Sequence, residues 1–357
     1  MTFHDIRKGK GKYKMFGVKV KKEYAEKIRR LLLNKKILNS KKKIFASGNY
    51  VFMPILDREK FEDLRLNNAK IVDCDFPSRK LKLSPIKKIK KNLHLGRKIL
   101  ALLPNKFELI GDVLILNIPD MLEKYEYEIA EAYAKVLKAK TVLKDIGGIV
   151  GKYREPMLKL LYGKETETIH KENNVKFKLD TMKIMFSSGN IKERMRIAYL
   201  SNSSEKVVDM FAGIGYFSIP IALYSKPEKV YACEFNPIAY HYLLENIRLN
   251  RVYKNVVPLY GDCMKVAPEG IGDRVIMGCL NAENYLLKAM RILDKKGIIH
   301  YHTLSPIEDV PSFIMKKVKK TAEKFGRKAK LISYRKIKSY APGIVHVVMD
   351  IEVLKQS

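Results

Sequence analysis

Residues 207–217 read Val-Val-Asp-Met-Phe-Ala-Gly-Ile-Gly-Tyr-Phe. An apolar run ends in Asp209, small residues follow, and an apolar helical pattern starts at Ser218. This order predicts a strand, a tight glycine turn and a helix, with backbone N–H groups presented at the carboxyl end of the strand. A G-x-G pair is common at strand–helix joints, so the stretch alone indicates only a possible ligand-binding turn.

The next strand along the chain restricts the kind of ligand that the turn can bind. Residues 229–234 predict a second strand that ends in Glu234, where an acid would hold a ribose diol. The small residues after Phe211, up to Gly213, let a ligand approach the backbone closely. Phe217 and Ser218 stand where the third glycine of a pyrophosphate-binding G-x-G-x-x-G would fall. We therefore expect a nucleoside-like cofactor without a pyrophosphate, and S-adenosylmethionine (AdoMet) fits that description.

Strands and helices alternate from residue 201 onward, and the chain closes on two strands at 330–336 and 344–353. This pattern predicts an α/β fold, a doubly wound Rossmann-like sheet of the class I methyltransferase type with an antiparallel edge. Small α+β domains precede it. In them, residues 16–20 alternate as a strand and 23–33 have helical spacing, 147–156 form a glycine-rich loop, and 167–180 predict a hairpin that turns at Asn173 and Asn174. The expected division is a basic arm (1–14), a small α+β module with a basic, RNA-facing surface (15–75), a linker (76–104), an α+β middle domain (105–200) and an AdoMet-dependent transferase domain (201–357).

The charge balance indicates a polyanionic partner. The chain has 70 Lys and Arg against 38 Asp and Glu, a formal net charge of +32. This excess favours nucleic acid over an anionic membrane, and a heat-adapted surface would carry a more even mixture of signs. No apolar run is long enough to span a membrane and no signal peptide is evident, so we expect a cytoplasmic, monomeric protein.

Polar residues follow the carboxyl ends of the predicted strands. Glu234 is assigned to the ribose, although a strand-end Glu can also pair with Lys. Asp262 is assigned to the adenine amino group, although Asp also suits a simple turn. Arg194 and Ser187 are assigned to the methionine carboxylate, although Arg is common on helix surfaces. The target would face the fourth strand end, at Gly278, Cys279 and Leu280.

Two residue types invite metal or nucleophile roles. His300 and His302 alternate on one predicted strand, but no third ligand is evident, so core or rim histidines are the favoured interpretation and no metal is expected. Cys263 and Cys279 are interpreted as small apolar fillers rather than nucleophiles. The four cysteines contain no C-x-x-C pair, which argues against zinc or a disulfide framework.

Several motifs together resemble one known family, the archaeal and eukaryotic AdoMet-dependent enzymes that modify guanine 37 of tRNA. The resemblance covers roughly residues 105 to 357 and lies in 165–172 (ETETIHKE), 185–190 (MFSSGN), 207–215, 273–278 (DRVIMG), 299–302 (IHYH) and 340–348 (YAPGIVHVV). It implies that Ser187, Arg194, Glu234, Asp262 and Cys263 contact AdoMet, and that tRNA is bound at the anticodon loop and at the elbow.

Two departures from the family bear on the reaction. The guanine-N1 methyltransferases carry Asn-(Leu/Pro)-Pro where this chain has Gly278-Cys279-Leu280, which disfavours N1 methylation. The module at 15–75 resembles the elbow-docking domain of those methyltransferases, a domain that the archaeal aminocarboxypropyl enzymes typically lack. The chain thus combines features of both branches.

The favoured reaction is AdoMet-dependent C7 methylation of 4-demethylwyosine at position 37 of tRNA(Phe). Three alternatives stay open: transfer of the 3-amino-3-carboxypropyl group to the same carbon, N1 methylation of guanine 37, and a non-catalytic tRNA-binding protein with a decayed AdoMet fold. Glu193 is the candidate general base and Arg154 the candidate positioning residue.

Overall fold

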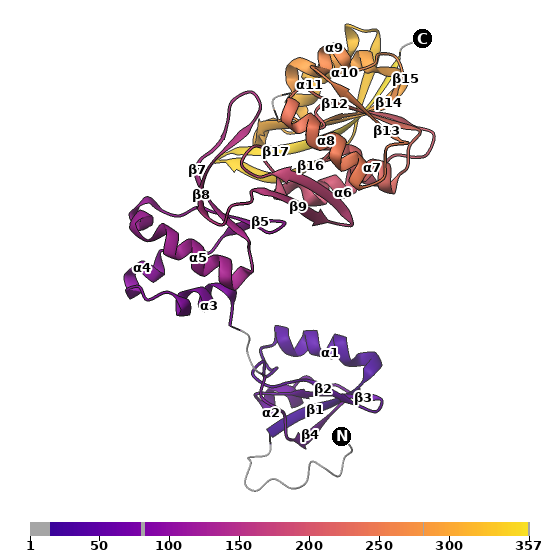
Figure 1. The fold of residues 1–357 in the computed structure, drawn as a ribbon. Helices are drawn as coiled ribbons and strands as arrows, with labels where there is room; N and C mark the ends of the chain where they lie inside the picture. The colour runs from indigo at the N-terminus through magenta and orange to yellow at the C-terminus, as the bar shows by residue number, and fades with distance from the viewer. Residues whose placement is uncertain (1–14, 80–82, 281, 356–357) are drawn as a thin grey trace. The chain divides into compact units, whose positions relative to one another are not determined.

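The computed structural model describes residues 15–79, 83–280 and 282–355, so the predicted basic arm at 1–14 lies outside the described residues. Contacts divide the chain into two compact units, Met1–Ser84 and Pro85–Ser357 (Figure 1). The first unit contains the module expected at 15–75, and the second contains the predicted middle and transferase domains.

The first unit is a four-stranded antiparallel sheet with two helices. The strand order is β2-β3-β1-β4, and Ile28 and Leu32 of the first helix are buried against Val18 and Val20 of the central strand. The alternation around residues 16–20 and the helical spacing from 23 to 33 are both confirmed. The elements are β1 (Met15–Lys21), α1 (Lys22–Asn34), β2 (Phe45–Ser47), β3 (Tyr50–Pro54), α2 (Arg58–Glu62) and β4 (Ala69–Cys74).

The segment predicted as a linker at 76–104 is instead partly helical. It contains α3 (Pro85–Asn92) and α4 (Arg97–Ala101). Ile89 and Leu103 are buried in one cluster with the long helix of the middle part, α5 (Glu126–Leu137). The lysines around Ile89 dominate the composition, yet the apolar residues between them fall on one helical face, and that face packs.

The middle part of the second unit is a four-stranded sheet of order β5-β6-β7-β8. β6 and β7 run parallel and are connected through α5, whereas the other neighbours are antiparallel. The glycine-rich stretch 147–156, expected as a loop, mostly extends these strands into a long hairpin that turns at 151–154. The strands are β5 (Phe107–Ile110), β6 (Val113–Leu116), β7 (Thr141–Val150) and β8 (Glu155–Tyr162).

A separate hairpin connects this sheet to the transferase part. β9 (Glu167–Glu172) and β10 (Val175–Asp180) pair antiparallel. Asn173 and Asn174 both have positive φ, 46° and 59°, as a two-residue hairpin turn requires and as asparagine tolerates. The predicted hairpin and its turn are confirmed.

The transferase part is a seven-stranded sheet of order β13-β12-β11-β14-β15-β17-β16. The first five strands are parallel, and β17 runs antiparallel to both of its neighbours, so the doubly wound sheet with an antiparallel edge is confirmed. The strands are β11 (Lys206–Asp209), β12 (Lys229–Glu234), β13 (Val256–Tyr260), β14 (Gly272–Met277), β15 (Leu293–Pro306), β16 (Arg327–Ala341) and β17 (Ile344–Lys355).

Helices cover both faces of this sheet and bury two separate apolar clusters (Figure 1). Ile197, Ile219 and Leu243 represent the helices in one cluster, and Ala289 and Val318 represent those in the other. The first group is α6 (Ile191–Ala198), α7 (Ser218–Tyr224) and α8 (Pro237–Leu249), and the second is α10 (Leu286–Ile292) and α11 (Ser312–Glu323).

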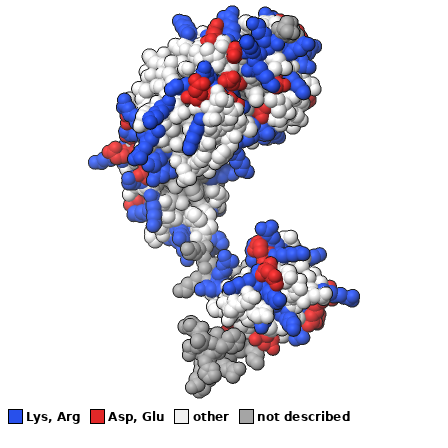
Figure 2. Space-filling view, turned by 90° about the vertical axis from the view of Figure 1, so that its right-hand side faces the viewer, with Lys and Arg blue, Asp and Glu red and all other residues white. Residues whose placement is uncertain are grey.

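The surface reflects the charge of the sequence. On the face drawn in Figure 2, Lys and Arg side chains are spread over both units, and Asp and Glu form smaller groups among them. Within the described ranges, no helix has the length and apolar character needed to cross a membrane.

Candidate functional site

The turn after β11 is fixed by a buried carboxylate. Asp209 accepts hydrogen bonds from the Ser218 hydroxyl at 2.7 Å and from the Phe211 backbone N–H at 3.3 Å. Burial raises the pKa of Asp209 to about 6, although the bonds from Ser218 and Phe211 counteract that rise. Asp209 thus connects the end of the strand to the start of α7 and shapes the turn between them.

Glu234, at the end of β12, points at the same turn. Its two carboxylate oxygens accept the backbone N–H groups of Gly213 and Asn236, each at 2.7 Å. Gly213 has φ +57°, a conformation that glycine adopts without strain. Burial raises the pKa of Glu234 against these two backbone donors. Since a carboxylate oxygen can accept more than one hydrogen bond, Glu234 keeps acceptor capacity for a diol beside the turn.

Asp262 and Cys263 stand at the end of β13, where α9 (Cys263–Val266) begins. One Asp262 oxygen caps that short helix by accepting the Met264 N–H at 2.9 Å, and the side chain is otherwise exposed. Cys263 is buried beside Cys233, and burial raises the pKa of its thiol. A protonated, packed thiol agrees with the apolar-filler interpretation of Cys263.

Arg194 is one of the most buried side chains of the described residues, only 2% exposed. Its guanidinium forms a bidentate pair with Glu172 of β9, with both N–O distances 2.7 Å, and also donates to the Ser187 carbonyl at 2.7 Å. Burial would raise the pKa of Glu172, but hydrogen bonds from His170 and Arg194 hold it below its usual value. Arg194 is therefore beside Ser187, as expected, with two of its five N–H groups left to donate.

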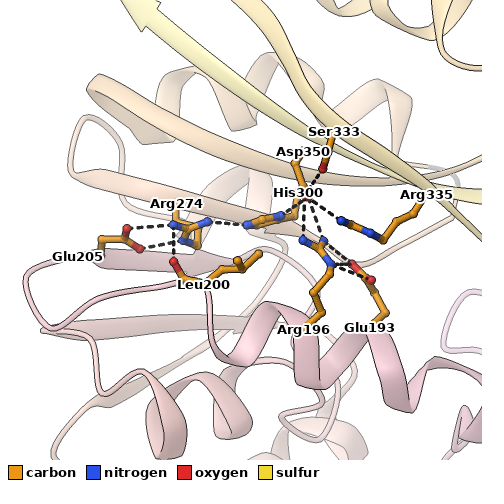
Figure 3. A network of polar contacts seen from close by, with 9 residues as sticks. All are labelled: Glu193, Arg196, Leu200, Glu205, Arg274, His300, Ser333, Arg335 and Asp350. Atoms are coloured by element: carbon orange, nitrogen blue, oxygen red, sulfur yellow. Dashed lines mark hydrogen bonds and ion pairs between the residues drawn. The ribbon is translucent and has the colours of Figure 1, made fainter.

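Glu193, the neighbouring residue, points into a different set of contacts (Figure 3). Both of its oxygens accept from Arg196, at distances from 2.5 to 3.1 Å, and the side chain is 3% exposed. The Arg196 guanidinium also donates to Asp350 of β17, at 2.8 and 3.0 Å. This arrangement favours a structural role for Glu193 and argues against the predicted base role, because a base needs a free lone pair near the target.

The ion pairs around Arg196 extend into a buried network shown in Figure 3. Asp350 accepts from Arg196, Ser333 and Arg335, and one of its oxygens lies 2.6 Å from Nδ1 of His300. Burial would raise the pKa of Asp350, but its hydrogen bonds and the His300 contact hold it far below its usual value.

The other ring nitrogen of His300 is also occupied. Its Nε2 lies 2.7 Å from Nη1 of Arg274, whose Nε and Nη2 donate to Glu205. The network therefore joins α6, β14, β15, β16 and β17 through side chains with charged partners at nearly every step.

The tip of the β7–β8 hairpin contacts the edge of the Glu234 turn. The Asn236 side chain donates to the Tyr153 carbonyl at 3.4 Å, and the rings of Tyr153 and Phe235 lie 5.3 Å apart. Arg154 is exposed, has φ +57° and lies 3.6 Å from the Met185 sulfur through Nη2. The structure thus brings Arg154 close to the segment that carries Ser187, with its charge free of any carboxylate partner among the described side chains.

Gly278 begins the segment expected to face the target. A Cβ added to it would lie 3.0 Å from the Phe217 ring, so Phe217 occupies the space that glycine leaves. The sequence assigned that space to the target base. In the structure the absence of a side chain at position 278 lets Phe217 pack against the strand end, and Cys279 and Leu280 follow half-buried.

Side chains absent from the sequence interpretation complete the site. Glu172 pairs with Arg194 from 22 positions away, and Asp350 pairs with Arg196 from 154 positions away. His346 of β17 lies beside His302, with Nε2 3.2 Å from Nδ1 of His302. Across the described ranges, no three His, Cys, Asp or Glu side chains are grouped as metal ligands.

These residues fit an AdoMet molecule. A buried carboxylate faces a glycine turn at the carboxyl end of β11, and Asp262 stands at the neighbouring strand end with one oxygen free of the helix cap. Parallel sheets of this order bind nucleosides at that edge. The fold and the turn define the class of protein, a Rossmann-like AdoMet-dependent transferase.

Comparisons with known proteins place the chain within that class. A family model of the TRM5/TYW2 methyltransferase domain matches residues 168–332, a TYW2 N-terminal domain model matches 89–166, and a tRNA methyltransferase 5 N-terminal domain model matches 17–61. The chain belongs to the TRM5/TYW2 family and is an AdoMet-dependent tRNA transferase.

Three curated relatives show how the family divides. The chain is 50% identical over 248 residues, 69% of this chain and 96% of the relative, to the tRNA(Phe) (4-demethylwyosine(37)-C(7)) aminocarboxypropyltransferase of Methanocaldococcus jannaschii. It is 34% identical over 339 residues, 94% of this chain and 98% of the relative, to the tRNA (guanine(37)-N(1))-methyltransferase Trm5b of Pyrococcus abyssi. It is 32% identical over 257 residues, 69% of this chain and 93% of the relative, to the tRNA 4-demethylwyosine(37)-methyltransferase Taw21 of Saccharolobus solfataricus.

A solved structure supports the cofactor. The structure of P. horikoshii TYW2 in complex with MeSAdo matches with a TM-score of 0.69 and 40% identity, covering 76% of this chain and all of that one. AdoMet as cofactor and tRNA as substrate, both predicted from the sequence, are thereby confirmed at the level of the family. The preference for methyl transfer is not: the aminocarboxypropyl relative shares more identity with this chain than the methyltransferase relatives do.

Proposed function

We propose that the protein transfers the 3-amino-3-carboxypropyl group of AdoMet to carbon 7 of 4-demethylwyosine at position 37 of tRNA(Phe). The observation that carries this proposal is the 50% identity to an aminocarboxypropyltransferase over nearly the whole of that relative. Gly278, Cys279 and Leu280 add to it, because none of these three side chains offers the amide that the guanine-N1 methyltransferases place at this strand end.

In this proposal the residues around the glycine turn bind the cofactor. Glu234 accepts the ribose hydroxyls and Asp262 the adenine amino group, while Arg194 and Ser187 hold the methionine carboxylate. Bound AdoMet supplies a positively charged sulfur that activates each carbon attached to it, so no covalent enzyme intermediate is needed. The protein therefore acts by orientation, which decides the carbon that faces the base.

The hairpin tip and the strand end act on the target. Arg154 is exposed near Met185 and has no carboxylate partner among the described residues, so it can contact an RNA phosphate or an electron-rich edge of the base. Base 37 must leave the stack to reach a buried cofactor, and the tip of the β7–β8 hairpin contacts the residues next to Glu234.

Methyl transfer to the same carbon is the second candidate. The 32% identity to the tRNA 4-demethylwyosine(37)-methyltransferase Taw21 supports it. The first unit adds to it, because residues 17–61 match the N-terminal domain of tRNA methyltransferase 5 and Trm5b aligns with 94% of the chain. Only the carbon that faces the base differs between the two reactions, and a small rotation of the cofactor separates them.

Nucleoside mass spectrometry decides between the reactions. The full chain is incubated with AdoMet and with tRNA(Phe) carrying either guanine 37 or 4-demethylwyosine, and the digested nucleosides are analysed. We expect an aminocarboxypropyl adduct on the tricyclic base only. A methyl adduct on that base would establish the second candidate, and methylguanosine from the first tRNA would establish N1 methylation.

Cofactor binding tests the enzyme interpretation separately. Glu234→Ala should weaken AdoMet binding roughly 100-fold in calorimetry, because two backbone donors and a diol lose a buried acceptor. The matched control is Glu228→Ala, an exposed carboxylate paired with Lys206 at 3.7 Å, which should leave the affinity unchanged. Absence of AdoMet binding by the parent protein would favour the decayed tRNA-binding alternative.

The first unit is proposed to contact the tRNA elbow. A groove of about 380 Å³ in this unit is lined by several cations, among them Lys42, Lys43 and Arg79. Changing these three to Ala in the full chain should weaken binding to whole tRNA by roughly tenfold or more and spare an anticodon stem–loop. The control changes Lys316, Lys319 and Lys320 of α11 to Ala. Equal losses on both RNAs would contradict elbow contact.

A further inference from the structure

Two buried histidines next to the cofactor turn keep unpartnered ring nitrogens. His302 of β15 and His346 of β17 are 0% and 1% exposed, and Nδ1 of His302 lies 3.2 Å from Nε2 of His346. Nε2 of His302 and Nδ1 of His346 have no hydrogen-bond partner among the described residues. The pair therefore has one internal hydrogen bond and a free nitrogen at each outer end.

The ring of His302 lies against the cofactor turn. The ring of His302 meets the ring of Phe217 edge to face, with centroids 5.3 Å apart. Phe217 ends the glycine turn and also fills the space beside Gly278. Met277 pairs with Tyr301, so Gly278 and His302 occupy the next positions on adjacent strands. Phe217 thus contacts both His302 and the strand end that the sequence assigned to the target.

The other outer end lies beside a cation and another unpartnered atom. His346 pairs in register with Lys338 of β16, and the ammonium of Lys338 lies 3.5 Å from a Cβ position at Gly189. The side-chain oxygen of Asn190, the next residue, is likewise buried and unpartnered among the described residues. Polar groups thus continue from His346 toward the segment that follows Ser187.

We propose that His302 and His346 relay the proton that carbon 7 of the target base releases, an inference that rests on the proposed function. Carbon 7 forms a bond to the cofactor carbon, the carbon–sulfur bond breaks, and its electron pair stays on the neutral sulfur. Carbon 7 then carries one hydrogen too many, and that proton must leave to restore the aromatic ring. His302 accepts it at Nε2 once the Phe217 ring has moved aside for the base.

Proton balance within the pair is complete. With hydrogen on Nδ1 of His302 and on Nδ1 of His346, a proton that arrives at Nε2 of His302 moves the Nδ1 hydrogen to Nε2 of His346. The hydrogen on Nδ1 of His346 then passes to water, which reaches the exposed side chain of Lys338. One proton enters and one leaves, no net charge stays in the core, and the original tautomers return by exchange after the product departs.

The surroundings keep this pair neutral and ready to accept. Burial lowers the pKa of His346 to about 4, helped by Lys338, and lowers that of His302 well below its usual value, helped by His346, His300 and Arg196. Asp350 acts on the pKa of His302 in the opposite direction. A weak base suffices here, because the carbon-bound proton of a cationic adduct is strongly acidic.

Single-turnover kinetics with deuterium at carbon 7 of the tricyclic base test the relay. In the parent protein proton removal is fast, so the two isotopes should react at the same rate. His302→Phe and His346→Phe should each slow the reaction roughly 100-fold or more, and the light substrate should then react at least about twice as fast as the heavy one. AdoMet affinity should stay that of the parent.

His302→Gln is the second variant, because glutamine can hydrogen-bond to His346 but cannot pass a proton on. The matched control is His241→Phe, an exposed histidine on α8. Rates within threefold of the parent, with no isotope effect, in both His302 variants would overturn the relay. Loss of AdoMet binding in both would also overturn it, in favour of a structural role. A parent protein that modifies neither tRNA would instead refute the proposed function.

Discussion

His300 and His302 lie two residues apart on the same face of β15, equally buried, and their surroundings differ completely. Both ring nitrogens of His300 meet charged partners, Asp350 at 2.6 Å and Arg274 at 2.7 Å. The polar partner of His302 is the neutral ring of His346, and Nε2 of His302 is unpartnered among the described residues. An unpartnered buried polar atom costs about 1–3 kcal/mol, so a folded protein that tolerates one usually uses it.

The comparison separates two uses of a buried histidine. His300 is a structural residue within a network that fixes α6 to the C-terminal strands, and its partners leave no acceptor for an incoming proton. His302 contacts Phe217 of the cofactor turn and has an unpartnered nitrogen, Nε2, that can accept a proton. Burial lowers the pKa of both rings, so the difference lies in their partners and not in their exposure.

We expect the largest effect on stability from removing Asp350, the charged partner of His300. Asp350→Ala leaves Arg196, Arg335 and His300 without their shared acceptor and should destabilise the protein by about 3–5 kcal/mol. Denaturant unfolding of parent and variant measures this change. Glu308→Ala, an exposed carboxylate on the loop after β15, is the control and should shift stability little. Equal effects of the two variants would refute the structural role of the network.

Removing the ring of His300 should have a smaller effect of the same sign. His300→Gln keeps one hydrogen-bonding group and should lower the free energy of unfolding by about 1–3 kcal/mol. Transfer by the folded variant should stay within about threefold of the parent and show no isotope effect at carbon 7, since a proton relay through His302 is intact. An isotope effect in this variant would erase the distinction between the two histidines.

Lowering the pH should destabilise the protein, because three buried histidines are held neutral in the folded state. The folded-state pKa values of His300, His302 and His346 all lie below the unfolded value of 6.5, so below that pH the unfolded chain binds more protons than the folded one. Stability therefore falls from pH 7 to pH 5, by about 1–2 kcal/mol for His346, whose folded-state pKa is about 4, and His300 and His302 add losses of the same sign. The thermal midpoint of the His302→Phe, His346→Phe double variant should fall less steeply over this range than that of the parent.

We expect the smallest change in stability at His302, the residue whose replacement should slow the reaction most. His302→Phe removes an unpartnered polar ring from an apolar surrounding, so its free energy of unfolding should lie between no change and a gain of about 1 kcal/mol. Denaturant unfolding and the kinetic assay, measured on the same variant, should show unchanged or higher stability together with a slower reaction. A loss as large as that of His300→Gln would mean that His302 is structural too.

The sequence predicted the parts of this site that follow from local pattern. Asp209 and Glu234 end apolar runs, and strand ends of a parallel sheet meet at one edge, so their convergence on the glycine turn was predictable. The turn at Asn173 and Asn174 was predictable for the same reason, because its conformational demand is carried by the residues themselves.

The remaining contacts depend on tertiary register. Arg194 pairs with Glu172 of the β9–β10 hairpin, and Arg196 pairs with Asp350 of β17. The local spacing of residues in the sequence predicts neither partner. Gly278 was interpreted as space for the target because the ring of Phe217, some sixty residues earlier, is not visible from the strand end. The helices at 85–101 were missed because lysines on the exposed face outnumber the apolar residues of the buried face.

The position of β17 also has a consequence for the order in which the protein matures. This strand is inserted between β15 and β16, yet it is synthesised after every other described strand. Until β17 emerges, β16 has no neighbour in the sheet, and Asp350 and the buried side chains of Val347, Met349 and Ile351 are missing. The transferase sheet is therefore completed last, and a translation product that stops before β17 would lack both the acceptor for Arg196 and part of the apolar cluster against the sheet.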